Sequence, residues 1–291
     1  MIHSQGLKRL TICSLTTMMC MAKVDTFAHT GIRDPVTGSS ESATTSYNAF
    51  TIPHGCSAGE GDTPPKKVKG QSAVFPFGPP AAALTGPGAV WVRLGQAPTP
   101  PTLLTAAEVA AIIGDEDEDP NTPPHLNLDV AGIQDASLFK TQTEEVNPAG
   151  TDPLGPHDSI PVRALNWRGG KLETNLLGIT QFRVTVPMIL DPCVSRVRVR
   201  IAVSNWCERN KNEANDADNN RADWWFTGET GPTKFVDPDL IQESFWTTLT
   251  VNNPNASECG QEPHEVAVMP SGADIDLYLP LQGFTEDPAP Y

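Results

Sequence analysis

The sequence lacks any apolar run long enough to cross a membrane. A spanning helix needs about 20 consecutive apolar residues, whereas the apolar stretch Leu10–Ala22 near the start is shorter and no later stretch reaches that length. We therefore predict no membrane span in the exported chain.

Several catalytic signatures are also missing. The chain has no G-x-S-x-G turn, no phosphate-binding P-loop and no H-E-x-x-H metalloprotease pair. Its cysteines form no C-x-x-C pair, which argues against a zinc or redox site built on them. These absences favour a protein that binds rather than one that catalyses, so we do not expect an enzyme.

Basic residues are scarce. The chain has 20 Lys and Arg against 35 Asp and Glu, a net charge of −15. A surface of that charge as a whole repels nucleic acid and anionic lipid and attracts cations. We expect no nucleic-acid partner.

The first residues have the pattern of an export signal. Lys8 and Arg9 precede the apolar stretch, and the small residues Thr26 and Ala28 stand where a signal peptidase reads the chain. Cleavage after Ala28 makes His29 the first residue of a single domain, 29–291. A rival cleavage after Ala22 leaves residues 23–28 attached. Either way, we expect the protein in the periplasm or at the cell surface.

The cysteine count fits an oxidising compartment. Cys13 and Cys20 leave with the signal, and an even number remain. We predict that the remaining four form two disulfides, with three pairings open: Cys56, Cys193, Cys207 and Cys259.

Proline and glycine punctuate the chain, with 28 Pro and 23 Gly. Between them lie short segments of alternating polarity that predict strands. In 194–206, Val197, Val199 and Ile201 should face inward, and Arg196, Arg198 and Arg200 outward. Further strands are expected over 46–52, 71–77, 88–94, 179–189, 244–252, 264–270 and 274–281. The pattern predicts an all-β, antiparallel β-sandwich of the immunoglobulin or fibronectin kind, with long Pro-rich loop insertions.

One short helix is expected over 105–113. Thr105 and Glu108 form a capping-box pattern, and Gly114 ends the helix. The polar, Pro-rich stretch 114–163 that follows is expected to be a loop-rich insertion between two groups of strands.

His29 is the first candidate metal ligand. At a new N-terminus, the α-amine and the imidazole of one histidine can bind the same ion and close a chelate ring. Copper favours nitrogen donors of this kind, and an α-amine titrates close to neutral pH. If His29 is not the first residue, it is an ordinary exposed histidine.

The N-terminal fifth of the chain resembles the YcnI-like exported copper-binding proteins. The similarity runs from "AHTGIRDP" through "YNAFTIPHGC" to "PKKVKGQSAVFP". The residues that carry it are His29, Pro35, Tyr47, Pro53, His54, Gly55, Cys56 and Pro76.

This resemblance implies a β-sandwich and a copper ion held by His29, supported by a carboxylate and a tryptophan. Glu41 and Asp34 are candidates for the carboxylate, and the tryptophan is not assigned. His54 is either a second ligand or a structural residue at a strand end. The resemblance also suggests a copper-transport membrane protein as a partner.

Other motifs are weaker. Asp216, Asp218 and Asn220 have the spacing of a calcium loop, but Arg221 replaces its glycine, so a solvated acidic loop is the better reading. The acidic run 115–119 is interpreted in the same way. Core packing explains most of the tryptophans Trp206, Trp224, Trp225 and Trp246, although one of the adjacent pair 224–225 should be more exposed.

Three classes of function compete. The first is capture or trafficking of copper through His29. The second is a copper enzyme similar to polysaccharide monooxygenases, which needs a second histidine from His54, His125, His157 or His264. The third is a disulfide-stapled cell-surface module without metal. We favour the first class, because it requires only His29 at the N-terminus of the processed chain and a strongly acidic protein, and the sequence offers both.

Overall fold

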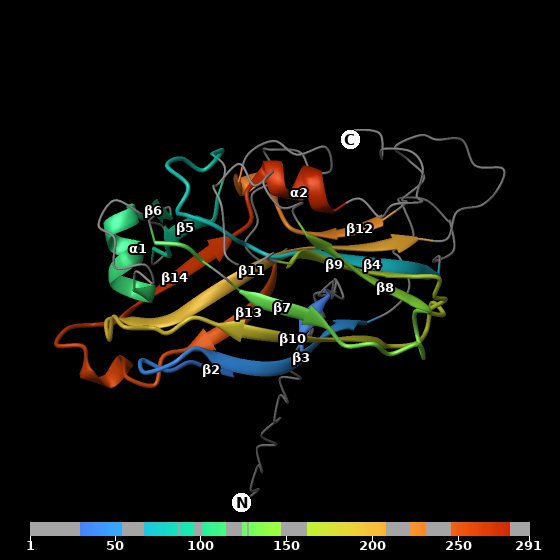
Figure 1. Ribbon diagram of the computed structural model, residues 1–291, viewed down its shortest axis with the longest axis horizontal. Helices are drawn as coiled ribbons and strands as arrows, with labels where there is room; N and C mark the ends of the chain where they lie inside the picture. The colour runs from blue at the N-terminus through green and yellow to red at the C-terminus, as the bar shows by residue number, and fades with distance from the viewer. Residues whose placement is uncertain are drawn as a thin grey trace, which may run out of the picture.

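The computed structural model describes residues 30–53, 67–86, 88–95, 101–114, 124–126, 128–146, 162–207, 222–230 and 246–279. Over these residues the chain is built mainly of strands, which form two sheets (Figure 1). The predicted all-β, sandwich-like fold is confirmed. No helix in the described part of the chain is long and apolar enough to cross a membrane.

The smaller sheet has four strands and is antiparallel throughout. Its order is β1-β3-β10-β7. The strands span Gly31–Ile32 (β1), Thr44–Ile52 (β3), Gly178–Val186 (β10) and Asp129–Gly132 (β7).

The larger sheet has the order β6-β5-β14-β11-β4-β9-β8 along its main path, and β12, β13 and β2 pair beside it. Its strands span Thr102–Leu103 (β6), Val90–Arg93 (β5), His264–Met269 (β14), Val194–Cys207 (β11), Val68–Val74 (β4), Val162–Arg168 (β9), Thr141–Val146 (β8), Ala222–Trp225 (β12), Thr247–Asn252 (β13) and Val36–Thr37 (β2). This sheet is mixed, because β14 runs parallel to β11 and β2 parallel to β13. A purely antiparallel sandwich was therefore the wrong expectation for this layer.

Strand β11 is the spine of the larger sheet. Residues 194–201 lie between β14 and β13, and residues 202–207 lie between β4 and β12. Val197, Val199 and Ile201 are buried in the main core, as the alternation predicts. Arg200 departs from the prediction, since it is 3% exposed and pairs with Glu229 at 2.7 Å. Burial behind the short 3-10 helix η1, Gly228–Thr230, explains the difference.

Two hydrophobic clusters account for the packing. The main one fills the space between the sheets and includes Phe50, Phe75 and Phe182, whose rings contact one another. The second includes Val74, Ala267 and Met269 of the larger sheet and the buried residues of α2. Figure 1 shows α2, in red, above the larger sheet.

Helix α1, Ala106–Ile113, matches the predicted helix. The Thr105 side chain accepts a hydrogen bond from the Glu108 amide, and the Glu108 carboxylate accepts one from the Thr105 amide, so the capping box is confirmed. Gly114 adopts a φ of 82° at the end of the helix, a conformation that favours glycine.

Helix α2, Gly272–Tyr278, replaces the strand predicted over 274–281. The Ser271 side chain caps it by accepting from the Asp274 amide. Ile275, Tyr278 and Leu279 are buried at helical spacing, whereas Leu277 is exposed. The N-cap and this spacing favour a helix over a strand.

The described part of the stretch 114–163 contains strands that the sequence did not predict. Strands β7 and β8 lie within it, and Val130 and Phe139 join the main core. Both strands are short, and β8 is mostly polar, so the pattern of alternation did not reveal them. Residues 115–123, 127 and 147–161 lie outside the described residues.

The sandwich has two ends. At the α1 end, the Ile189 amide donates to the Ser39 carbonyl and the Leu190 amide donates to the Ile112 carbonyl. At the opposite end, which we call the distal end, lie Thr30, Ile52, Val68, Gly178 and Cys207. Figure 1 shows α1 at the left of the molecule.

Candidate functional site

Thr30, at the distal end, is an anchored residue. It is 2% exposed, although it comes just before the edge strand β1. Its hydroxyl accepts a hydrogen bond from Asn205 Nδ2 at 2.8 Å, and its carbonyl accepts one from Thr247 Oγ1 at 2.9 Å. The smaller sheet's first strand is thus fixed to β11 and β13 of the larger sheet.

These bonds belong to a buried polar chain between the sheets. Gln71 Nε2 donates to Asn205 Oδ1 at 2.8 Å, and Thr180 Oγ1 donates to Gln71 Oε1. All of these side chains are buried. Buried polar groups are costly unless they are hydrogen-bonded, so the bonds hold Thr30 in one place. Hydroxyls and amides do not titrate near neutral pH. This row of hydrogen-bonded side chains therefore fixes the position of the segment that begins at Thr30, and it supplies no acid or base.

The sequence analysis did not predict these buried hydrogen bonds, although the sequence contains a pattern that indicates them. Asn205 lies in phase with the inward residues Val197, Val199 and Ile201 of β11, and its partner across the ladder is Gln71 of β4. A polar residue at an inward position of two neighbouring strands predicts a buried hydrogen bond.

The pairing of β1 with β3 brings together the two residues that are adjacent in sequence to the candidate histidines. These are Thr30, which follows His29, and Pro53, which precedes His54. Gly31 faces Thr51 in the antiparallel pair β1–β3, so Thr30 and Pro53 lie at the same end of that ladder. His29 is bonded to Thr30 and His54 to Pro53. His29, His54 and Cys56 themselves lie outside the described residues, as does His157.

Asp34 is separated from this end. It lies beside Asn48, whose Nδ2 donates to the Asp34 carbonyl, and its carboxylate pairs with Arg33 at 2.7 Å. From Asn48 to Ile52 the extended strand covers about 13 Å at the usual rise per residue. Asp34 instead lines a groove of about 340 Å³ with Arg196 and Thr250.

Glu41 lies at the α1 end. It precedes β3, whose first residue is Thr44 and whose last, Ile52, is at the distal end. Its amide donates to Ser39 Oγ, and the Ser39 carbonyl accepts from the Ile189 amide. The structure therefore does not bring Glu41 to the end where Thr30 lies.

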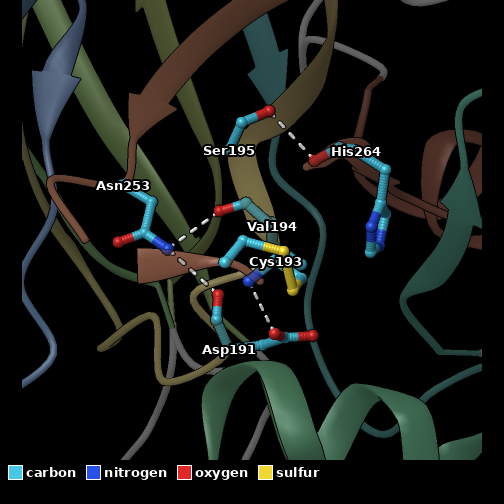
Figure 2. Close-up of a disulfide and its surroundings, with 7 residues drawn as sticks. Asp191, Cys193, Val194, Ser195, Asn253 and His264 are labelled. Carbon is cyan, nitrogen blue, oxygen red and sulfur yellow. Dashed lines mark hydrogen bonds between the residues drawn. A yellow bond between two sulfur atoms is a disulfide. The ribbon is translucent and has the colours of Figure 1, made fainter. Parts of the chain in front are cut away.

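His264 lies at the α1 end, next to the disulfide Cys193–Cys259 (Figure 2). It lines a groove of about 430 Å³ with Arg198 and Glu262. Burial, and then the charge of Arg93, lower the pKa of His264, against the opposing pull of Asp191 and Glu108. Its ring is therefore neutral at physiological pH.

His125 lies beside Phe77. Its ring packs edge-on against Phe77 at 4.7 Å between centroids. Over the residues that the structure describes, no three His, Cys, Asp or Glu side chains converge in a way that would hold a metal ion. The residues with calcium-loop spacing, 215–221, and the acidic run, 115–119, both expected to be solvated acidic loops, lie outside those described.

The cysteines follow the prediction as far as they are described. Cys193 and Cys259 form a disulfide, and Cys207 is disulfide-bonded as well, with a partner outside the described residues. Near the first bridge, Asn253 Nδ2 donates to the carbonyls of Asp191 and Val194 (Figure 2). One bridge therefore secures the α1 end, and Cys207 is held at the distal end.

The tryptophans pack as expected. Trp206, Trp225 and Trp246 are buried, and Trp224 is partly exposed. Trp206 and Trp224 meet edge-to-face at 5.5 Å, and Trp206 Nε1 donates to Ser72 Oγ at 2.9 Å. They belong to the packing of the distal half of β11.

Comparison with known proteins does not extend this picture. No family model matches the sequence, and no curated protein matches it. Membership of the YcnI-like proteins accordingly stays a prediction carried by residues 28–76.

Proposed function

We propose that the protein captures or carries copper after export, with His29 as the first residue of the processed chain. The observation that carries the proposal is the anchoring of Thr30. A metal-binding residue that is covalently attached to a fixed, buried residue has fewer accessible conformations before the ion binds. Less conformational entropy is therefore lost on binding.

The chemistry of the donor set fits copper. The α-amine and imidazole of His29 supply two nitrogens in one chelate ring, and copper binds such donors more tightly than other divalent first-row metals do. His54 is the second proposed ligand. It follows Pro53 in the sequence, and Pro53 lies at the same end of the β1–β3 pair as Thr30. Asp34 and Glu41 are not carried into the proposed shell.

The acidic body supports the same role. A net charge of −15 raises the local concentration of cations around the protein. In this proposal copper is cargo, and the recipient is a copper-transport membrane protein.

The test uses the exported protein and titration with copper at fixed pH. We expect His29→Ala, and separately a glycine added ahead of His29, to lower copper affinity at least about 100-fold, because each removes one arm of the chelate. Both variants should melt at the same temperature as the wild type without copper, since each change precedes Thr30.

His264→Ala is the matched control, because it removes a histidine at the other end of the sandwich. Its copper affinity should equal that of the wild type. Unchanged affinity in both N-terminal variants would reject the proposal, as would N-terminal sequencing that finds a first residue other than His29.

A further inference from the structure

A groove lies where the chain crosses from one sheet to the other. Residues 33–35 connect β1 of the smaller sheet to β2 of the larger sheet, and β2 pairs with β13. The groove has a volume of about 340 Å³ and is lined by residues of this crossing, by β13 and by Arg196 of β11. We call it the crossing groove.

The wall that the crossing forms is held in place along its length. Before it, Thr30 is buried and bonded to the larger sheet. Within it, the Asp34 amide donates to Asn48 Oδ1 at 3.3 Å, and Asn48 Nδ2 donates to the Asp34 carbonyl at 2.7 Å. After it, Val36 is buried and pairs with Val251 of β13. The crossing groove is therefore preformed, and little conformational entropy is lost when a ligand enters it.

A row of polar side chains on β13 lines the groove. The intervening residues of β13 are buried in the main core, so Thr248, Thr250 and Asn252 face the other way and are half-buried. Within the described part of the chain, the side chains of Thr250 and Asn252 make no hydrogen bond. A hydroxyl and a carboxamide can each donate and accept, so this row offers both kinds of bond to a ligand.

Both charged groups of the crossing groove already have a counter-ion. Asp34 Oδ2 accepts from Arg33 Nε at 2.7 Å, and Arg196 Nη1 donates to Glu265 Oε1 at 3.0 Å. Among the residues described, Asp34 Oδ1 and Arg196 Nε and Nη2 have no hydrogen-bond partner. The groove thus has little net charge to attract a free ion, but it keeps an acceptor and donors for neutral polar groups.

We infer that the crossing groove binds a neutral saccharide of one or two rings. Sugar hydroxyls both donate and accept, which matches a lining of hydroxyls, a carboxamide, a carboxylate and a guanidinium. Ile32 and Pro35 also line the groove and supply apolar surface for the C–H face of a sugar ring. The volume lies at the lower end of the range of about 300–1,000 Å³ for small-molecule sites. A lining this polar does not suit an apolar ligand.

The inference goes beyond the proposed copper function and requires neither His29 nor metal. Asp34 lies beside Asn48, and the extended strand from Asn48 to Ile52 separates it from the distal end. A saccharide in the crossing groove therefore leaves the distal end accessible, so that the two kinds of binding can be measured independently.

The experiment is amide NMR of the metal-free exported protein during titration with cellobiose, maltose or diacetylchitobiose. With at least one of these sugars, we expect shifts that centre on residues 32–36 and 248–252. The affinity follows from the same titration, and the melting temperature of each variant reports its fold.

Two variants remove single groups from the groove. Thr250→Val keeps the shape of the side chain without its hydroxyl and should weaken binding about fivefold, the worth of one neutral hydrogen bond. Arg196→Gln should weaken it about tenfold or more, because hydrogen bonds to charged groups are stronger. Glu265 keeps its pair with Arg198 in that variant, so the fold should survive.

Matched controls lie across the larger sheet, beyond β11 and β14. Thr102→Val removes an exposed hydroxyl from β6, and Arg93→Gln removes an exposed cation from β5. Both should bind the sugar as the wild type does, and all four variants should keep its melting temperature.

Three outcomes would overturn the inference: no amide shifts with any of the three sugars, equal losses of affinity in the controls, or a stronger response to glucuronate or inorganic phosphate than to neutral sugar. The last would make the groove an anion site. Thr250→Val should bind copper as the wild type does, so failure of this inference and failure of the proposed function are distinguishable.

Discussion

Single side chains at inward strand positions decide how the distal end is built. Val197, Val199 and Ile201 follow the alternation and fill the core. Asn205 continues the same phase, yet it binds Thr30 and Gln71 across the gap between the sheets. A pattern of alternation predicts which face a residue occupies, but the partner of a buried amide depends on a strand far away in the sequence.

At this scale, His264 predicts how stability changes with pH. Its pKa is lowered from the ordinary value of 6.5, chiefly by burial. The folded state therefore holds this proton less tightly than the unfolded state. The His264 contribution should be intact above about pH 6.5 and should be lost as the pH falls from there toward the lowered value.

Urea unfolding of the wild type and His264→Gln at several pH values checks this expectation. Between about pH 7 and pH 5, the wild type should lose more unfolding free energy than the variant does. Arg93→Gln should lessen the difference, because the Arg93 charge contributes to the lowered pKa. Parallel pH profiles for the wild type and His264→Gln would contradict the prediction.

Among the elements, β11 and the short helix η1 form the least predictable contact. The alternation of 194–206 places Arg200 outward with Arg196 and Arg198, and for the other two this holds. Arg196 is exposed and Arg198 is partly exposed, and both pair with Glu265 of β14. Arg200 is buried because Glu229 of η1 lies over it. Helix η1 comes about 20 residues after the end of β11, and no local sequence pattern predicts that it packs against Arg200.

The buried pair gives a prediction for the elements that it joins. Glu229→Ala removes the carboxylate that pairs with the buried Arg200 guanidinium, and breaking a buried pair of this kind costs about 3–5 kcal/mol. We expect the free energy of unfolding to fall by that amount in denaturant titration.

Arg198→Ala is the matched change on the same strand. Because Arg198 is partly exposed, its ion pair with Glu265 is worth less than about 1 kcal/mol. Equal losses in the two variants would show that the burial of Arg200 adds nothing to the cost.

Two other element-scale differences have different causes, one local and one in the connection between strands. Alternating apolar residues over 274–281 are compatible with a strand, but Ser271 and Asp274 cap a helix there. The parallel alignment of β14 with β11 follows from the connection between them, which residue alternation does not reveal. By contrast, the α1 prediction succeeded, because Thr105, Glu108 and Gly114 are all local signals.

For the whole molecule, composition predicted the class of fold, and the cysteine count predicted bridges. The candidate site was less predictable. The sequence indicates the histidines, but it does not indicate that Asp34 and Glu41 lie away from the distal end. Their separation is set by the length of β3.

The disulfide at the α1 end should matter for the stability of the entire fold. Cys193 and Cys259 are 66 residues apart, and closing a loop of that length constrains the unfolded chain by about 4 kcal/mol in the chain-entropy account. We expect Cys193→Ser with Cys259→Ser to lower the unfolding free energy by about that amount. Thermal or denaturant unfolding measures it.

Thiol counting provides the control. The denatured wild type should show no free thiol without reductant, and the double variant should show none either. Free thiols in the double variant would mean that the remaining bridge depends on the first, so the stability loss would no longer measure one disulfide.

Thr30 also imposes an order of assembly. Its hydroxyl bonds to a residue 175 positions later, and its carbonyl to one 217 positions later. During synthesis from the N-terminus, Thr30 is made long before Asn205 and Thr247, the residues that it binds. Contacts between residues so far apart in the sequence also form slowly. The segment that begins the described chain is among the last to be locked, so any function that depends on it starts only with the finished molecule.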